Sequence, residues 1–301
     1  MRFGVHIHTG QGFKKAVAEA RAAGAQAIQI FAGNPRGFKR TVYDPAAWDE
    51  FRRLRKEHDI GPVVIHTSYL VNLVTANKDL HVKSAHLVAN DLDVAAKAGI
   101  EYVNTHLGSY GDQRRDDGFA RVCATIEALV KTAAPGPMLL LENSAGGGNA
   151  CGARLEELGE ILRSVGSPRV GVCLDTAHAW AMGYELASKK GVDAFLRDIK
   201  KHIGFKHVRA LHMNDTQVEL GSNRDRHWHV AQGLIGATGF RHLLAAPGLA
   251  HVAAICETPK TAELDKSNVA MLRKLAPRGT TVRRSVPKAE LSKAKSGRKQ
   301  R

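Results

Sequence analysis

Short apolar runs rich in β-branched residues alternate along the chain with longer stretches whose apolar residues recur at helical spacing. The runs end about every 36 residues, which is the size of one strand followed by one helix. We therefore expect eight strands. They are predicted at Phe3–His8, Ala27–Phe31, Val63–His66, Tyr102–His106, Met138–Glu142, Val170–Asp175, Val208–His212 and Val252–Glu257.

Start and stop signals predict helices between several of these runs. An apolar repeat from Phe13 to Ala23 is followed by Gly24, which is typical of a helix end. Asp44 and Pro45 are typical of an N-cap and a first helical residue. Ser84 is expected to cap a helix that ends near Lys97–Gly99. Further helices are predicted over Gly152–Val165, Val192–His202, Gly239–Ala246 and Ala262–Leu275.

Eight strand–helix units in succession predict an α/β fold of the (β/α)8 TIM-barrel type, with residues 1–277 as one domain. A doubly wound open sheet is the alternative. Such a sheet usually carries a GxGxxG phosphate turn after its first strand, and the segment GVHIHTGQGF lacks that motif. The barrel is therefore the favoured fold.

The charge of the 301-residue chain is +15, which fits a polyanionic partner such as nucleic acid. Residues 278–301 contain nine Lys and Arg but one Glu, a net +8, so residues 1–277 carry the remaining +7. This segment has almost no large apolar residues, and we expect a disordered basic tail that binds nucleic acid without sequence preference. A solubilising tail is the alternative.

No run of 18 apolar residues or signal-peptide core is found in the sequence. The four cysteines form no CxxC pair, which argues against a disulfide scaffold and a thiolate zinc site. We expect a cytoplasmic protein without a membrane partner. Nothing in the sequence indicates an obligate protein partner, so a monomer is expected.

The predicted strand ends carry the candidate chemistry. Six consecutive strands end in an imidazole or a carboxylate, and in a parallel barrel all such ends converge on one face. Burying several carboxylates together is unfavourable unless cations compensate them, and this mixture is a ligand set for zinc or manganese. The six residues are His66, His106, Glu142, Asp175, His212 and Glu257.

Three further residues extend this predicted cluster. His178 follows Asp175 by three positions, so the turn after the sixth strand offers two ligands. Asp225 and His227 are separated by one residue, and an extended segment points both side chains the same way. They are expected to bind a third ion, although on their own they also fit a polar surface loop. His6 and His8, at the end of the first strand, are expected to support the site.

The motifs resemble those of the endonuclease IV family of apurinic/apyrimidinic endonucleases over residues 1–276. The matching segments are HTSYLVNL (66–73), NTHLGS (104–109), LLENSAGGG (140–148), GVCLDTAHAWAMGY (171–184), HMNDTQVELGSNRDRH (212–227) and CETP (256–259). The resemblance implies three Zn²⁺ ions, with Mn²⁺ accepted at one site. His66, His106 and Glu142 would hold the first ion. Glu142 would also bridge to the second.

The resemblance assigns the second ion to Asp175, His212 and Glu257 as well, and the third to His178, Asp225 and His227. It implies hydrolysis of duplex DNA 5′ to abasic sites in base excision repair, leaving a 3′-hydroxyl and a 5′-deoxyribose phosphate. Glu142 is the expected catalytic residue whose loss is most damaging, because it serves two ions.

The resemblance also identifies residues that grip DNA. Tyr69 and Leu70 match the family's minor-groove wedge, although ordinary loop packing is the alternative, and Arg36 matches a DNA-inserting arginine. Gln232 departs from the pattern, because many members carry Glu there. Phe38 takes the place of a bulky family aromatic residue.

Two other functions are consistent with parts of the pattern. A metal-dependent sugar isomerase or epimerase on the same barrel would explain Glu142, Asp175, His212 and Glu257. It would explain neither the third ligand group nor the positive charge. A DNA-binding protein without catalysis would tolerate gaps among the nine ligand positions, and the sequence has none. Fold alone does not decide among these functions.

Overall fold

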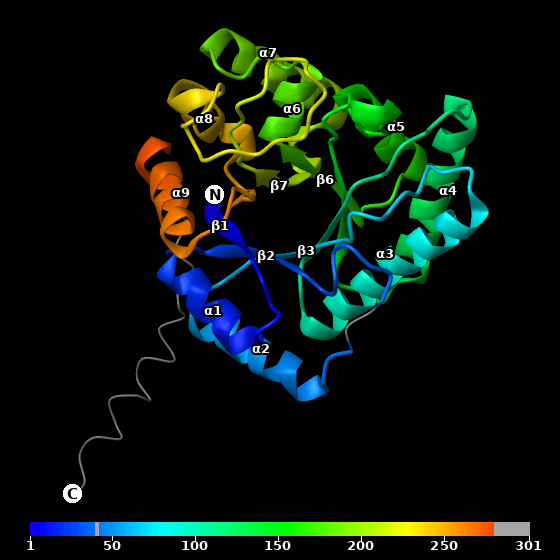
Figure 1. Cartoon of the computed structure of the whole chain (residues 1–301), viewed down its shortest axis with the longest axis horizontal. Helices are drawn as coiled ribbons and strands as arrows, with labels where there is room; N and C mark the ends of the chain where they lie inside the picture. Colours follow the sequence, from blue (N-terminus) through cyan, green and yellow to red (C-terminus); the bar gives the residue numbers. More distant parts are fainter. Residues whose placement is uncertain (40–41, 280–301) are drawn as a thin grey trace, which may run out of the picture.

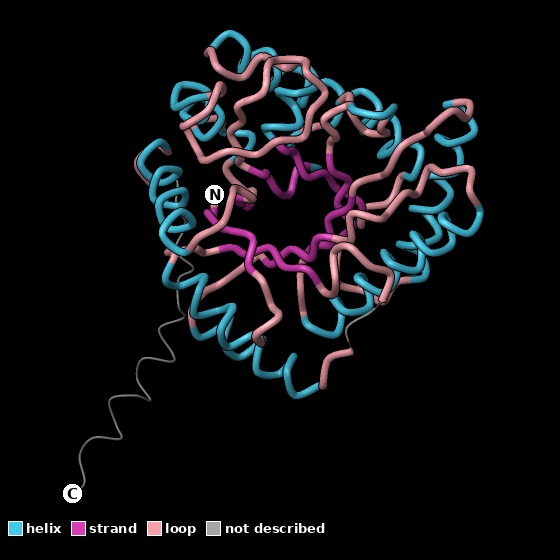
Figure 2. The backbone as a smooth tube through the Cα atoms, in the orientation of Figure 1, coloured by secondary structure: helices cyan, strands magenta, loops and turns pink. Residues whose placement is uncertain are grey.

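The computed structural model describes residues 1–39 and 42–279. In it, eight parallel strands close into a barrel in chain order, surrounded by helices (Figures 1 and 2). The predicted (β/α)8 TIM barrel is confirmed. The predicted tail lies outside the described residues from position 280 onward. The strands are β1 (Arg2–Ile7), β2 (Ala27–Phe31), β3 (Val63–His66), β4 (Tyr102–Thr105), β5 (Met138–Glu142), β6 (Val170–Asp175), β7 (Val208–His212) and β8 (Ala253–Cys256).

The helices form an outer ring around the barrel (Figure 2), and the apolar side chains along one side of the amphipathic helices are buried. In α1, for example, Phe13, Ala16, Val17 and Ala20 are buried. The α-helices are α1 (Phe13–Ala22), α2 (Pro45–Glu57), α3 (Lys78–Ala98), α4 (Arg115–Thr132), α5 (Leu155–Val165), α6 (Thr176–Met182), α7 (Lys189–Asp198), α8 (Gly236–Leu244) and α9 (Ala262–Leu275).

Helix starts were predicted less accurately than strands. The Asp44 cap is confirmed, because its side chain accepts a hydrogen bond from Ala46 N at 2.9 Å. The Ser84 cap is wrong. α3 begins at Lys78 and is capped by Asn77, whereas Ser84 lies buried within the helix and donates its hydroxyl to Leu80 O at 2.7 Å. A serine that returns its hydroxyl to the preceding turn does not need to end a helix.

Other predicted helix bounds differ by up to three residues. α5 begins at Leu155 rather than Gly152, because Gly152 has a φ of 78° in the left-handed region and lies outside the helix. α7 begins at Lys189, where the Ser188 side chain accepts a hydrogen bond from Gly191 N. Residues Ile199–Ile203 continue it as one turn of π-helix.

The barrel interior below the mouth is apolar. Two small buried clusters are separate from the large core that the strands share with the helices. One contains Leu140 and Cys173, and the other contains Val64 and Ile255. Each of these residues precedes a predicted ligand by two positions on its strand. Because side chains alternate between the two faces of a strand, the ligand layer lies directly above this apolar floor.

Within the described residues, no helix combines the length and the apolar character needed to cross a bilayer.

Candidate metal centre

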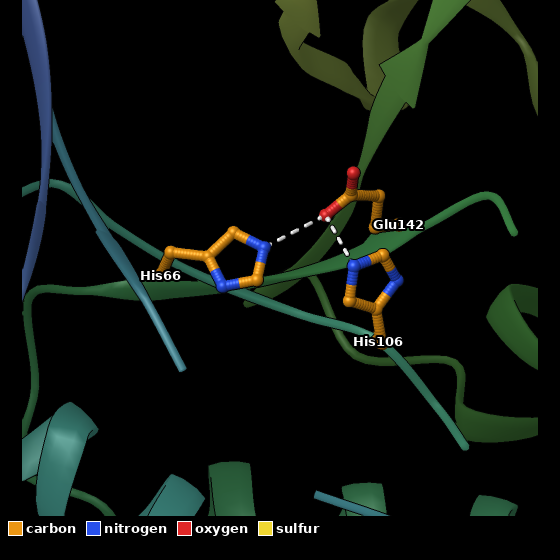
Figure 3. A group of neighbouring side chains, drawn as sticks. All are labelled: His66, His106 and Glu142. Carbon is orange, nitrogen blue, oxygen red and sulfur yellow. Dashed lines mark hydrogen bonds and ion pairs between the residues drawn. The ribbon is translucent and has the colours of Figure 1, made fainter. Parts of the chain in front are cut away.

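Glu142, the last residue of β5, lies at the centre of the predicted ligands. Its side chain is fully buried. His66 Nε2 and His106 Nε2 lie 3.1 Å and 3.7 Å from the same oxygen, Oε2, and Figure 3 shows both imidazoles directed at it. His212 Nδ1 is 2.9 Å from the other oxygen, Oε1. One carboxylate therefore lies between two groups of nitrogen ligands, and its two oxygens can serve one cation each.

A second group gathers around His212 at the end of β7. Its Nδ1 is 2.8 Å from Glu257 Oε2 and 3.7 Å from Asp175 Oδ2. Together with Glu142, these residues offer ligand atoms that all lie within 4.8 Å of one another. Such a group is compact enough to surround one metal ion.

The third group lies on the side of Asp175 that faces α6. His178 Nε2 and His227 Nε2 are each 3.2 Å from Asp225 Oδ1, and His227 Nε2 is 3.5 Å from Asp175 Oδ2. Asp175 also caps α6, because its side chain accepts a hydrogen bond from His178 N at 2.9 Å. This cap explains the spacing of three residues. Asp175 thus borders two groups, which sequence reasoning did not predict.

Three of the imidazoles are oriented by backbone carbonyls. His66 Nδ1 lies 2.8 Å from Thr67 O, His178 Nδ1 lies 2.9 Å from Asn143 O, and His227 Nδ1 lies 3.1 Å from Glu257 O. Donation of the Nδ1 proton to a carbonyl leaves Nε2 as the nitrogen that faces the cluster. This is the usual arrangement around metal-binding histidines, and it shows that the imidazoles fit metal ligation.

His212 has the opposite orientation. Its Nε2 lies 2.8 Å from Gln29 Oε1, so Nδ1 faces the cluster. Gln29 lies on β2 and is fully buried. Gln29 was not predicted from the sequence, because a glutamine inside a strand carries no distinguishing signal. Its role depends on β7, which carries His212, lying across the barrel from β2.

Buried asparagines orient the carboxylates and were also not predicted. Asn104 Nδ2 donates to Glu142 Oε2 at 2.6 Å. Asn214 Nδ2 donates to Asp175 Oδ2 at 2.6 Å, while its Oδ1 accepts from Glu257 N at 2.7 Å. Each asparagine is two positions from a predicted ligand, so strand alternation was the available signal.

The carboxylates attract positive charge to the cluster. Burial lowers the pKa of His178, but Asp175, Asp225 and Glu142 outweigh burial and raise this pKa to about 10. For His227, burial again opposes the change, and Asp175 and Asp225 raise the pKa to about 9. In the metal-free chain, bound protons thus supply the positive charge that a metal ion would bring.

The cluster opens on one side into a pocket of about 450 Å³. Glu142 and Asp175 are fully buried, whereas the Asp225 side chain is 60% exposed. Residues of the loops that follow β1, β7 and β8 line the opening, among them His8, Arg226 and Lys260, together with His6 of β1. A neighbouring pocket of about 630 Å³ shares His106, His178 and Asp225 with the first. His178 and Asp225 of the third group are therefore accessible from both pockets.

The predicted DNA-contacting residues lie on loops beside this opening. Tyr69 and Leu70 follow β3 with 56% and 37% of their surfaces exposed, and Tyr69 lines both pockets. Tyr69 N donates to Pro35 O at 3.0 Å, which joins this loop to the exposed Arg36. His6 Nδ1 lies 3.3 Å from Glu257 Oε1, where a supporting residue was expected.

Comparison with known proteins shows which barrels the chain is similar to. The family model of xylose isomerase-like TIM barrels matches residues 17–275. The probable endonuclease 4 of Methanoculleus marisnigri is 39% identical over 276 residues, which cover 91% of this chain and 98% of that protein. The probable endonuclease 4 of Chloroflexus aggregans is 36% identical, with 91% and 97% covered.

Solved structures agree with these relatives. The crystal structure of endonuclease IV from Thermus thermophilus has a TM-score of 0.81 at 37% identity, with 91% of this chain and 98% of that chain covered. A D-tagatose 3-epimerase-like protein has a TM-score of 0.71 at 16% identity, with 91% and 97% covered. The second likeness shows the shared barrel and nothing beyond it.

Proposed function

The chain belongs to the endonuclease IV family, and from this membership we propose that it hydrolyses the phosphodiester 5′ to abasic sites in duplex DNA. The products would be a 3′-hydroxyl and a 5′-deoxyribose phosphate, as in base excision repair. The reaction depends on three Zn²⁺ ions, with Mn²⁺ as an alternative occupant of one site. The principal support is the convergence of nine imidazole and carboxylate side chains in one partly open cluster.

The donor set suits these ions. His66, His106 and Glu142 would hold the first ion. Glu142, Asp175, His212 and Glu257 would surround the second. His178, Asp225 and His227 would hold the third, with Asp175 at its edge. Nitrogen and carboxylate oxygen ligands without thiolate are typical of zinc and manganese sites that act on substrates.

Bound zinc would lower the pKa of a coordinated water toward about 7 and neutralise charge that develops on the phosphate. The protein's own side chains would hold the metal ligands in place for in-line displacement at phosphorus. Glu142 keeps two ligand groups in register through its two oxygens, and Asn214 fixes Asp175 relative to the strand end that carries Glu257. The apolar floor excludes water from below.

The loop that follows β3 would distort the DNA. An abasic site leaves a gap in the base stack, so the nucleotide is displaced at low cost and apolar side chains can fill the gap. Tyr69 and Leu70 are exposed at the rim, and Arg36 lies on the adjoining loop. We therefore assign all three residues to DNA binding.

Tyr69→Ala tests this assignment. Removal of one stacked or wedged aromatic side chain should weaken binding to an abasic duplex about tenfold or more, with a much smaller effect on an intact duplex. Fluorescence anisotropy with both duplexes measures the ratio. Equal weakening for the two duplexes would show that Tyr69 is not a wedge.

The proposed activity is tested with a labelled duplex that contains one tetrahydrofuran abasic analogue. We expect zinc-loaded protein to make one incision 5′ to the analogue and to leave a 3′-hydroxyl that a polymerase extends. An intact duplex and a chelator-treated sample are the controls. Absence of lesion-dependent incision by protein shown to contain zinc would refute the proposal.

A sugar isomerase or epimerase remains the alternative, because barrels of that class share the fold at 16–18% identity. It leaves Asp225 and His227 without a role. Conversion of ketohexoses by the metal-loaded protein, measured beside the incision reaction, separates the two functions. We further propose that residues 1–277 form the catalytic domain, that the basic segment from 278 adds DNA affinity, and that the protein acts as a cytoplasmic monomer.

A further inference from the structure

Lys260 lies on the segment that joins β8 to α9, three positions after Glu257. Its side chain is 28% exposed and lines the pocket of the metal centre. The ammonium contacts the backbone carbonyl oxygen of His6, and it lies 3.6 Å from Asp265 Oδ2. His6 in turn contacts Glu257. Lys260 is therefore fixed beside one of the metal-ligand groups.

The ammonium of Lys260 has capacity for another partner. A lysine ammonium carries three N–H donors. The His6 carbonyl accepts one of these donors, and the Asp265 carboxylate lies beside the ammonium at ion-pair distance. At least one N–H donor of Lys260 is therefore left. Because the side chain borders the pocket, this donor can reach an acceptor there.

The charge of the filled centre favours an anion next to Lys260. With neutral imidazoles, the nine ligand groups carry −4 from Glu142, Asp175, Asp225 and Glu257. Three divalent ions would contribute +6, which leaves +2, and Lys260 adds a further positive charge opposite Asp265. The Asp265 carboxylate offsets the charge of Lys260, so it is the +2 of the filled centre that favours an anionic ligand in the pocket that Lys260 lines.

We propose that Lys260 binds a phosphate of the damaged DNA strand adjacent to the phosphate that is hydrolysed. This inference rests on the proposed function. Lys260 is a substrate-binding residue. It extends the proposed DNA contacts of the mouth from the β2 and β3 loops, which carry the cationic Arg36 and the aromatic Tyr69, to the β8 side. The barrel order places β8 beside β1, which is next to β2, so these contacts follow one continuous arc of the rim.

A purely structural role is the competing explanation. The contacts with His6 and Asp265 join the end of β1 to the first turns of α9, so Lys260 could act only as a strap between them. Loss of such a strap would lower thermal stability without changing the dependence of DNA binding on salt. The two roles therefore differ in a measurable property other than activity.

The test compares Lys260→Met, Lys260→Arg and the matched control Lys266→Met, which removes an exposed charge from α9. Binding to the tetrahydrofuran duplex is measured at several salt concentrations, with zinc content and melting temperature for each protein. We expect Lys260→Met to bind about fivefold more weakly and to reduce the slope of log K against log salt by about one. Lys260→Arg should restore most of the affinity, and Lys266→Met should resemble the wild type.

Substitution of single phosphates in the duplex identifies the contact. Each phosphate next to the lesion is replaced in turn by an uncharged methylphosphonate, and binding by the wild type and by Lys260→Met is compared. At one position the substitution should weaken binding by the wild type and have little further effect on the variant. This lack of additivity would show that Lys260 and that phosphate interact directly.

Three results would overturn the inference. They are an unchanged salt slope in Lys260→Met with a lower melting temperature, equal effects of Lys260→Met and Lys266→Met, and additive effects at every methylphosphonate position. Failure of the proposed function gives a different result, because wild-type protein with zinc would then not incise the tetrahydrofuran duplex at all.

Discussion

At the scale of single residues, Glu142 is the side chain on which we expect the candidate metal centre to depend most. It is fully buried and contacts His66, His106 and His212. Since outer partners of metal ligands already contribute about 10- to 100-fold, we expect Glu142→Gln to lower the incision rate more than about 100-fold. Single-turnover kinetics on zinc-reconstituted protein measure this effect.

The matched control for Glu142→Gln is Glu160→Gln, which changes an exposed glutamate on α5. It should incise at the wild-type rate. Near-normal incision by Glu142→Gln would show that this carboxylate does not hold two ligand groups together.

The raised pKa values of the cluster predict how pH acts on stability. His178 has a pKa of about 10 in the folded chain against 6.5 ordinarily, because Asp175 and Asp225 outweigh the opposing effect of burial. A group with a raised folded pKa stabilises the fold fully below its unfolded pKa, and this stabilisation is lost as the pH rises through the folded value. Metal-free protein should therefore lose stability from about pH 6.5 upward.

The stabilisation of the fold by zinc should have the opposite pH dependence, because protons compete with the metal for the same imidazoles and carboxylates. The stabilisation by zinc, measured as the difference in free energy of unfolding between zinc-loaded and chelated protein, should grow from pH 6.5 to 8.5. Urea denaturation at three pH values gives this difference. A difference that shrinks with pH would contradict assignment of these histidines as ligands.

At the scale of elements, the segment between β7 and α8 is held by one buried carboxylate. Asp215 accepts hydrogen bonds from Gly233 N and Ile235 N, each at 2.9 Å, and from Gly236 N at 3.1 Å. Its backbone pairs in both directions with Trp228, which follows His227. Asp215 therefore fixes the segment that carries Asp225 and His227.

Asp215→Ala should lower the free energy of unfolding by about 2–4 kcal/mol, because four backbone donors, Thr216 N included, lose a charged acceptor in a buried setting. It should also reduce zinc content by about one ion per chain. Urea denaturation and elemental analysis measure the two effects. Asp112→Ala, at an exposed position, is the control, and unchanged zinc content in Asp215→Ala would separate this segment from the metal centre.

The strands were predictable within about one residue because each is buried on both faces, so its apolar run is continuous. Helix starts were less predictable. α3 and α7 begin with exposed charged residues, Lys78 and Lys189, which carry no apolar period. α4 was not predicted at all. Gly118 lies in its first turns, and only the structure shows why glycine stands there, since a Cβ would come within 2.6 Å of the Tyr110 ring.

The metal centre was predictable to the extent that strand ends define it. All nine predicted ligands come together, and their role as ligands stays a prediction. The second contact of Asp175 and the amides of Gln29 and Asn214 were not predictable, because they depend on the relative placement of strands distant in sequence.

At the scale of the whole molecule, positive charge is divided between the barrel and the segment beyond it. Truncation after Pro277 removes nine cationic residues and one glutamate. We expect DNA binding to weaken about tenfold at moderate salt and its salt dependence to become shallower, because fewer phosphates are neutralised. Anisotropy titrations at several salt concentrations measure both, and zinc content should be unchanged. An unaltered salt slope would show that the segment takes no part in binding.

The direction of α9 determines at which end of the barrel the basic segment begins. The helix starts beside the mouth and extends 14 residues, about 21 Å, to the opposite end of the barrel, where Arg273 contacts the Gly24 carbonyl ahead of β2. The chain thus leaves α9 at the pole of the barrel opposite the candidate metal centre. The DNA contacts proposed for the segment after residue 279 therefore start from the pole opposite the mouth, and removal of this segment should leave the pockets at the mouth intact.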